Sequence, residues 1–452
     1  MDDLIMPGFN ITNKKLSALA LQALDTARAG GASDCEVDVS EGFGQSVTVR
    51  HQEVETIEYN RDKGISISVY LGQRRGHAST SDFSAQSLRD TVDAALSIAR
   101  FTATDPCAGL PDEKLLARSG LDAKTLDLYH PWKLSMEEAI HLARRCEQAA
   151  FDVSPLVTNS EGATVGTHES HFISANSLGF MGGYAASRHS ISCAVIVGEG
   201  DEMQRDDWYS GHRAAEDLSS PEIIGQYAAQ RTLSRLGARK LSTRQVPVLF
   251  EAPLATGLIG SFVHAVSGGA LYRKSSFLLD TLGQPIFPKF MHISERPHLP
   301  RGLASSPFDD DGIATHDREV ISDGVLQGYF LSTYSARKLG MATTGNAGGS
   351  HNLIVEPGSL DFEGLLRTMD TGLLVTELLG HGINYVTGDY SRGAAGYWVE
   401  KGEIAYPVQE ITIAGNLKDM FQNIVAIGND VVIRGSKQVG SILIHRMTVA
   451  GN

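Results

Sequence analysis

The sequence predicts an α+β protein with a first domain over residues 1–240 and a second over residues 241–452. A helical pattern, several strand-like runs and another helical pattern occur twice before residue 240. This order is typical of α-β-β-β-α units on one antiparallel sheet, and the repeat suggests an internal duplication. After residue 240 the chain is mostly strand-like runs separated by glycine turns. We therefore expect a mostly antiparallel second domain that closes as a barrel or sandwich.

Composition and charge indicate a globular protein without a nucleic-acid partner. The chain has 452 residues, of which 42% are hydrophobic and 20% charged, and its formal net charge is −14. We see no cluster of Lys and Arg residues that would offset this charge locally. Because the phosphate backbone repels an acidic surface, nucleic-acid binding is not expected.

The chain carries no recognisable targeting or membrane segment. Its N-terminal residues, MDDLIMPGFNITNKK, begin acidic and contain no apolar core of the length that a secretory signal needs. No run of about 18 apolar residues occurs, so no membrane span is expected. The four cysteines lie far apart in the sequence. We expect a cytoplasmic protein whose cysteines stay reduced.

Apolar periodicity predicts the elements of the first domain. Residues 13–28, 84–101 and 221–239 each place apolar side chains on one face of a helix. A further helix begins at Ser135 and has two glutamates in its first turn, where the helix dipole favours carboxylates. The strand-like runs between these helices are 35–39, 46–50, 54–59, 64–71, 163–167, 171–175, 180–186 and 190–197.

The second domain is organised around residues 246–269. Residues 246–250 are predicted to form a buried strand, and a helix follows from Pro253 to two glycines, 268–269, which are expected to end it. One face of this helix is apolar. The other carries small residues that would let a backbone or an extended ligand approach closely, together with one histidine. The residues of that face are Gly257, Gly260, Ser261, His264 and Ala265.

A second candidate region is the run GLLVTELL, residues 372–379, which is followed by Gly380-His381-Gly382. In a helix, Glu377 and His381 would share a face about 6 Å apart and could bind one ion. A short apolar run closed by glycine favours a strand instead, in which four residues span roughly 13 Å. The pair would then not hold a metal unaided. We interpret Glu377 as a structural acceptor or a cleft residue.

These segments resemble the TldD/PmbA family, also called the modulator of DNA gyrase family, and in particular its PmbA (TldE) branch. The likeness covers nearly the whole chain, and its most specific parts are VTELLGHGINYVTGDYSRGAAGYW, PVQEITIAGNL and GSILIHRMTVAG. In the TldD branch the strand and helix of the 246–269 region carry HExxxH, with both histidines on a metal. Here Val263, His264 and Gly268 stand at the positions of the first histidine, the glutamate and the second histidine. A late cysteine ligand of that branch is also missing, because residues 433–437 contain none.

The resemblance implies a fold and a function. The fold is an N-terminal α/β domain followed by a mostly antiparallel β domain. The chain would be a PmbA-like subunit, without metal ligands or catalytic residues, that pairs with a zinc-carrying TldD-like subunit. The pair would cleave unfolded or extended peptides, including peptide-antibiotic precursors and an antitoxin. The shared fold also makes a homodimer plausible when the partner is absent.

Five residues are candidates for lining a substrate channel. His264 comes from the small face of the predicted helix, and His351 lies in a glycine-rich loop, residues 345–353, that resembles a PmbA-branch motif. Glu377 and His381 come from the run discussed above, and Asp389 from a turn-rich loop.

Three functions are compatible with the sequence. The chain is the non-metal subunit of a metallopeptidase that holds peptide by strand addition, a stand-alone metallopeptidase with a different ligand set, or a peptide-binding protein without hydrolytic activity. Metal content separates the second from the others. Activity in a mixture with a TldD-like partner separates the first from the third.

Overall fold

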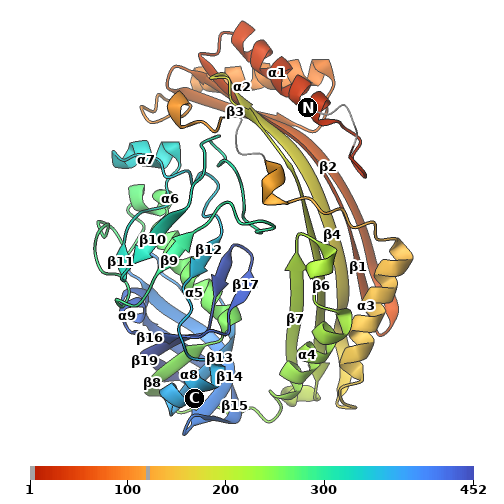
Figure 1. Cartoon of the computed structure of the whole chain (residues 1–452), viewed down its shortest axis with the longest axis vertical. Helices are drawn as coiled ribbons and strands as arrows, with labels where there is room; N and C mark the ends of the chain where they lie inside the picture. Colours follow the sequence, from red (N-terminus) through yellow and green to blue (C-terminus); the bar gives the residue numbers. More distant parts are fainter. Residues whose placement is uncertain (1–5, 119–122, 452) are drawn as a thin grey trace. The chain divides into compact units, whose positions relative to one another are not determined.

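The computed structural model describes residues 6–118 and 123–451, and the chain forms two compact units, whose elements are labelled in Figure 1. The first unit comprises Met1–Leu233 and Pro300–Thr315, and the second comprises Ser234–Leu299 and His316–Asn452. The predicted division at residue 240 assigned residues 300–315 to the second domain, whereas the structure assigns them to the first unit.

Long-range contacts hold residues 300–315 on the first unit. The ring of Phe308 packs edge-on against Phe180 at a centroid distance of 5.1 Å. The guanidinium of Arg301 donates to the carboxylate of Asp127 at 2.7 Å. These partners are far from the segment in sequence, and so no local pattern could predict the assignment.

The first unit contains six main strands and one two-residue strand, with helices before, between and after them. In chain order the elements are α1 (Asn13–Ala29), β1 (Asp34–Arg50), β2 (Glu53–Leu71), β3 (Arg74–Thr80), α2 (Ala85–Phe101), α3 (Met136–Phe151), β4 (Val157–Asn176), the two-residue β5 (Met181–Gly182), β6 (Ala185–Val197), β7 (Gln204–His212) and α4 (Pro221–Leu233). Single-turn 3-10 helices occur at Glu113–Leu115, Ala123–Leu126, Gly200–Glu202 and Ala215–Asp217.

These strands form one antiparallel sheet. Its order is β3-β2-β1-β4-β6-β7, with β5 added on β4. The pair β1–β4 lies at the centre, and Figure 1 shows β1, β2 and β4 as long curved strands that run side by side. The predicted fold class, with its twice-repeated α-β-β-β-α order on one antiparallel sheet, is confirmed.

The central strands are longer than the sequence predicted. Residues 35–39 and 46–50 were expected as separate strands, but β1 runs through both as a single strand of 17 residues. The apolar alternation stops at Gly42 and Gly44, yet β1 stays paired with β2 and β4 on both sides there. A Cβ at Gly44 would lie 2.5 Å from the carbonyl oxygen of Thr167, so the close strand approach requires glycine at this position.

One face of the sheet is covered by helices. Val37 and Val39 are buried beneath α1 and α2, while Val47 and Val49 are buried nearer α3. The alternate residues of β1, which point to the other face, are polar or glycine and none of Asp38, Ser40 and Arg50 is buried. This alternation with period two is the pattern of a sheet with one dry face.

The second unit contains the remaining strands and several short helices. They are β8 (Arg244–Phe250), α5 (Ala252–Ala265), α6 (Gly268–Tyr272), β9 (Ile293–Glu295), β10 (Arg318–Ser322), β11 (Val325–Leu326), α7 (Thr333–Leu339), β12 (Leu353–Val355), α8 (Phe362–Met369), β13 (Gly372–Leu379), β14 (Asp389–Glu400), β15 (Glu403–Asn416), α9 (Leu417–Gln422), β16 (Ile424–Ile427), β17 (Val432–Arg434), β18 (Lys437–Val439) and β19 (Ile442–Ala450).

Five of these strands close into a barrel. β8 pairs with β13 in parallel, and β13, β14, β15, β19 and β8 are then joined by antiparallel pairs that complete the ring. A second sheet has the order β11-β10-β9-β12-β18-β17. The core beside α5 centres on Phe262, whose ring lies edge-on to Phe287 at 5.1 Å and to Phe421 at 6.2 Å. The predicted barrel-like β domain is confirmed.

The helix predicted from Pro253 is confirmed, but the glycines 268–269 do not end it in the way that the sequence suggested. α5 stops at Ala265, and Ser267 caps a separate short helix, α6, that begins with Gly268. The two glycines are therefore not a left-handed stop signal. Gly268 is needed because a Cβ there would lie 2.2 Å from the hydroxyl of Ser335 on α7. Among the helices that the structure describes, none is long and apolar enough to cross a membrane.

His189 is a buried titratable group in the first unit. Its ring is fully buried, and Nε2 lies 2.8 Å from the carbonyl oxygen of His130, so Nε2 carries the proton and donates. Nδ1 has no hydrogen-bond partner in the structure. Burial lowers the pKa of His189; the His130 carbonyl and Glu216 act in the opposite direction, and the charge of His130 lowers it further.

We predict that His189→Gln makes stability less dependent on pH. A histidine whose pKa is lower in the folded state than in the unfolded state contributes stability above the unfolded-state pKa of about 6.5. This stability is lost as pH falls below about 6.5, by up to about 1.4 kcal/mol per pH unit for one proton. Glutamine keeps a donor for the His130 carbonyl but cannot titrate. The slope of unfolding free energy against pH between about pH 7 and 5 should become shallower.

The matched control for this prediction is His141→Gln on the exposed side of α3. Urea unfolding at several pH values measures both variants. An unchanged slope in His189→Gln, or an equal change in both variants, would contradict the assignment of the acid sensitivity to His189.

Candidate functional site

The small-residue face of α5 is the first feature of the candidate site. Leu258 and Phe262 anchor the opposite face in the core. On the small face, Lys437 of β18 lies across Gly260, since a Cβ on this glycine would be 3.6 Å from Cε and 3.9 Å from Nζ of the lysine. Gly260 thus admits a close neighbour, which is a side chain of the β17–β18 hairpin, whereas Ser261 and Ala265 of the predicted small face are buried.

Lys437 was not recognised from the sequence as a site residue. It stands in the segment where the family resemblance led us to look for a cysteine ligand. Burial lowers the pKa of its ammonium group. The side chain places a cationic group over α5, one helical turn before His264. In the sequence, Lys437 is a single lysine after a glycine turn, and no motif or spacing indicates that it belongs to the site.

His264 lies at the exposed end of α5 and contacts the loop between β13 and β14. Its ring centroid is 4.0 Å from that of Tyr385. The carbonyl oxygen of Tyr385 in turn accepts a hydrogen bond from the backbone N–H of Phe277 at 2.8 Å, which holds the loop in place. Partial burial, and secondly the charge of Arg273, lower the pKa of His264. The imidazole is therefore neutral near pH 7.

His381 belongs to this same loop, and Asp389 begins β14 directly after it. Asn384 donates its backbone N–H to the carbonyl oxygen of Asp389 at 2.8 Å and closes the loop. The Asp389 carboxylate accepts from the Thr387 hydroxyl at 2.7 Å and from the Asn416 side chain at 3.3 Å. His381 is exposed just beyond the end of β13. The structure therefore brings His264 beside the loop that carries His381 and leads into Asp389.

Glu377 has a different partner. It lies on β13, so the strand interpretation of residues 372–379 is confirmed and the helical pairing with His381 does not form. A β-bulge interrupts the β13–β14 register between Val375 and Glu377. The Glu377 carboxylate forms a salt bridge with Arg235, whose side chain is only 9% exposed. Of the two roles considered for Glu377, this salt bridge with Arg235 favours that of a structural acceptor.

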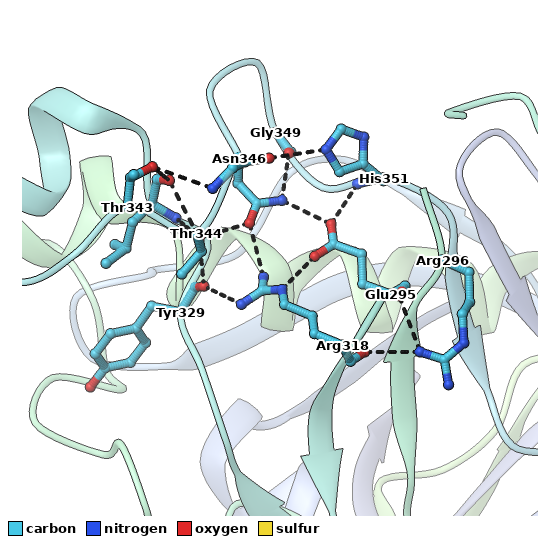
Figure 2. A network of polar contacts seen from close by, with 11 residues as sticks. Glu295, Arg296, Arg318, Tyr329, Thr343, Thr344, Asn346, Gly349 and His351 are labelled. Carbon is cyan, nitrogen blue, oxygen red and sulfur yellow. Dashed lines mark hydrogen bonds and ion pairs between the residues drawn. The ribbon is translucent and has the colours of Figure 1, made fainter. Parts of the chain in front are cut away.

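His351 belongs to a buried polar network, which Figure 2 shows. Its backbone N–H donates to Oε1 of Glu295 at 2.7 Å, and its Nε2 lies 3.1 Å from the carbonyl oxygen of Gly345. Oε1 of Glu295 also accepts from Asn346 at 2.8 Å, and Oε2 accepts from Nε of Arg318 at 2.6 Å. Glu295 is 1% exposed, so these donors replace water around its charge.

This network supports the site instead of presenting groups to solvent. Arg318 also donates to the carbonyl of Tyr329 at 2.9 Å and stacks over the ring of Phe330 at 4.9 Å. Phe330 exchanges backbone hydrogen bonds with Val266 and Gly268, where α5 ends and α6 begins. The glycine-rich loop is thereby connected to the end of α5 through fixed contacts. The sequence analysis selected His351 but did not select Glu295 and Arg318, which form most of the hydrogen bonds of this network.

The α5 region does not fit a metal ion. Val263 and Gly268 have no side-chain ligand atoms, and the Lys437 ammonium would repel a divalent cation. Within residues 6–118 and 123–451, no three His, Cys, Asp or Glu side chains converge as a ligand set. The chemistry that this surface offers is a neutral imidazole, a cation and a tyrosine ring beside a small-residue helix face.

Comparison with known proteins identifies the chain. Three family models match in order: PmbA/TldA metallopeptidase domain 1 over residues 35–99, the central domain over 129–236 and the C-terminal domain over 243–451. The metalloprotease PmbA of Escherichia coli O157:H7 is 52% identical over 433 residues, which cover 95% of this chain and 96% of that protein. The chain belongs to the PmbA/TldD metallopeptidase family.

The branch of this PmbA/TldD protein is also decided. The chain is 48% identical to the PmbA homolog of Haemophilus influenzae, with 95% of each chain covered, but only 22% identical to the TldD homolog of the same organism. Among solved structures, a putative modulator of DNA gyrase from Bacteroides thetaiotaomicron has a TM-score of 0.92 at 28% identity, covering 98% of this chain and all of that one. TldE from Thermococcus kodakarensis shares the fold, with a TM-score of 0.83 at 19% identity and coverage of 96% and 100%.

Proposed function

We propose that this chain is the PmbA-like, non-metal subunit of a cytoplasmic metallopeptidase, and that a TldD-like subunit carries the zinc. The observation that supports this most is the Lys437 side chain over Gly260 of α5. In the family resemblance this helix holds the metal of the other branch. A lysine at that place, together with Val263 and Gly268 at the two histidine positions, disfavours a cation.

The substrates that we propose are unfolded or extended peptides, including peptide-antibiotic precursors and an antitoxin. The second unit has sheet edges that a strand could join, and the edge strand β17 belongs to the hairpin that carries Lys437. Strand addition recognises backbone hydrogen-bonding groups and tolerates many side-chain sequences. His264, His351, Glu377, His381 and Asp389 stay our candidates for the channel, with Lys437 added.

The proposal predicts how metal and activity are distributed. The purified chain should contain much less than one zinc per molecule and should not cleave peptides. The TldD-like partner should carry the zinc, and peptidase activity should appear when the two are mixed. Metal analysis and a peptide-cleavage assay of each chain and of the mixture measure this. About one zinc per molecule with cleavage by this chain alone would establish a stand-alone peptidase.

Two variants connect the test to the site. Lys437→Met keeps the aliphatic stem but removes the charge, and His264→Ala removes the imidazole. Both should lower the activity of the mixture while leaving thermal unfolding nearly unchanged, whereas Lys289→Met at an exposed position should do neither. If the mixture is no more active than the partner alone, although this chain binds peptide, the third function, a peptide-binding protein, replaces our proposal.

A further inference from the structure

The helices α6 and α7 lie in two stretches of the sequence without carboxylates. Residues 252–279 and 324–355 contain no Asp or Glu, although the chain has 53 of these residues. The two stretches pack together, since the backbone N–H of Gly268 at the start of α6 donates to the carbonyl oxygen of Phe330, shortly before α7, at 2.8 Å. Figure 1 shows α6 and α7 next to each other. The charge that these stretches bring to their common surface is therefore positive.

Two cations of this surface are stacked on two tyrosine rings that contact each other. The rings of Tyr272 and Tyr334 lie edge to face at a centroid distance of 5.8 Å. The guanidinium of Arg273 lies over the Tyr272 ring at 5.1 Å, and its Nη1 donates to the Tyr272 hydroxyl at 3.0 Å. The ammonium of Lys338 lies over the Tyr334 ring at 5.2 Å. Contact with an aromatic face holds a cation in place without neutralising it as a carboxylate would.

Two further cations extend this cluster. Lys274 follows Arg273 directly after α6, and Arg337 precedes Lys338 in the last turn of α7. All four cations are exposed. In the sequence they are two separate pairs, so the sequence analysis did not show the cluster that the fold assembles. We define the basic α6–α7 face as Tyr272, Arg273, Lys274, Tyr334, Arg337 and Lys338.

The basic α6–α7 face adjoins His264 of the candidate site. The hydroxyl of Ser267, which caps α6, donates to the carbonyl oxygen of His264 at 2.8 Å. Partial burial, and secondly the charge of Arg273, lower the pKa of His264, so the guanidinium acts on the imidazole electrostatically. A ligand bound at His264 would therefore experience the positive field of this face.

Carboxylates are the ligands that this face fits best. A guanidinium group binds a carboxylate through two parallel hydrogen bonds, and a lysine adds a point charge. A long polyanion such as nucleic acid would extend beyond the face and meet the rest of a chain whose net charge is −14. Repulsion from that surface acts over about 10 Å. A short acidic peptide segment would meet only the cations.

We propose that the basic α6–α7 face binds an acidic segment of the peptide substrate beside His264, so that this subunit selects peptides rich in Asp and Glu. The inference rests on the proposed peptidase function and adds a substrate class to it. Strand addition recognises only the peptide backbone, whereas this face distinguishes side chains by their charge.

Binding of two matched peptides to the purified full-length chain tests the proposal. One extended peptide contains several glutamates, the other has glutamine in their place, and both carry an uncharged fluorophore. Fluorescence anisotropy should show at least about tenfold tighter binding of the glutamate peptide at low salt, and the preference should decrease as salt rises. Arg273→Gln/Lys274→Gln should remove most of this preference and leave binding of the glutamine peptide unchanged. The control Lys289→Gln/Lys401→Gln removes the same charge from exposed positions outside this face and should keep the preference.

Two further measurements test the place and the ligand. NMR titration of isotope-labelled histidine should give His264 a higher pKa in Arg273→Gln than in the natural chain, because a nearby cation is removed. Equal binding of the two peptides, an equal loss of preference in both double variants, or an unchanged pKa of His264 overturns the inference. If a single-stranded oligonucleotide binds more tightly than the glutamate peptide and Arg273→Gln/Lys274→Gln abolishes this binding, the ligand is a nucleic acid and not a peptide.

These outcomes are separate from those of the proposed function, because the binding assay needs neither zinc nor the partner. A preference for glutamate together with an inactive mixture would refute the peptidase function and support the acidic-peptide site. An active mixture that binds and cleaves both peptides equally would refute the acidic-peptide site alone.

Discussion

Replacement of Glu295 by alanine is expected to destabilise the second unit by about 3–5 kcal/mol, because it removes one partner of a buried ion pair. The Arg318 side chain is 13% exposed and would retain its charge without the Glu295 carboxylate. Asn346 and the backbone N–H of His351 would also lose their acceptor. We expect the loop over residues 343–351 to loosen before the unit unfolds. Urea unfolding, together with hydrogen exchange of that loop, measures both effects.

A matched control for this prediction lies on the adjoining strand. Glu319 of β10 forms a salt bridge with Arg296 at 2.7 Å, but the Glu319 side chain is 47% exposed. Glu319→Ala should cost less than about 1 kcal/mol, since exposed ion pairs contribute little. If the two alanine variants lose similar stability, or if exchange in the 343–351 loop is unchanged in Glu295→Ala, the carboxylate does not organise this loop.

Replacement of Glu147 by alanine is expected to destabilise the first unit by about 2–4 kcal/mol, since a fully buried carboxylate and its hydrogen bonds are lost. Glu147 lies on α3 and is 0% exposed. Its two oxygens accept from the backbone N–H groups of His51 at 2.9 Å and Gln52 at 2.7 Å. These residues form the β1–β2 turn, with φ values of 51° and 63°. The left-handed turn is thus held by a side chain from a distant helix.

Glu137→Ala provides the comparison, because Glu137 is an exposed residue of the same helix. It should change the unfolding free energy by less than about 0.5 kcal/mol. Hydrogen exchange at residues 51–52 should accelerate in Glu147→Ala only. An additional His51→Gly/Gln52→Gly variant, which relieves the left-handed strain, should reduce the cost of losing Glu147. Turn amides that stay protected in Glu147→Ala would show that the turn needs no cap.

Local patterns predicted the elements better than their extents. Ser135 and Glu138 form a capping box at the start of α3, where the sequence placed a helix start. The strand at 372–379 was also correct, because glycine closes a run too short for a helix. β1 was divided in two, since its middle carries glycine and polar residues that interrupt alternation. Pairing with two neighbours, which a single sequence does not display, carries the strand through that interruption.

The candidate site was predicted only in part. His264 was expected on the small face of the helix and lies there, beside a loop that includes His381 and ends where Asp389 begins β14. The network that orders His351 could not be anticipated. Glu295 and His351 are 56 residues apart, and Arg318 approaches from a third element. A lone glutamate in a strand-like run has no periodicity that would indicate a buried acceptor.

The sequence by itself determined the α+β class, the repeated element order, the family and its branch, and the absence of HExxxH, because periodicity and motifs are properties of neighbouring residues. The tertiary structure alone decided that residues 300–315 join the first unit, that Lys437 lies over Gly260, and that the cations beside α6 and α7 form one face. Each of these depends on contacts between residues distant along the chain. Such contacts form only when packing brings the elements together, and their energies depend on burial that composition does not reveal.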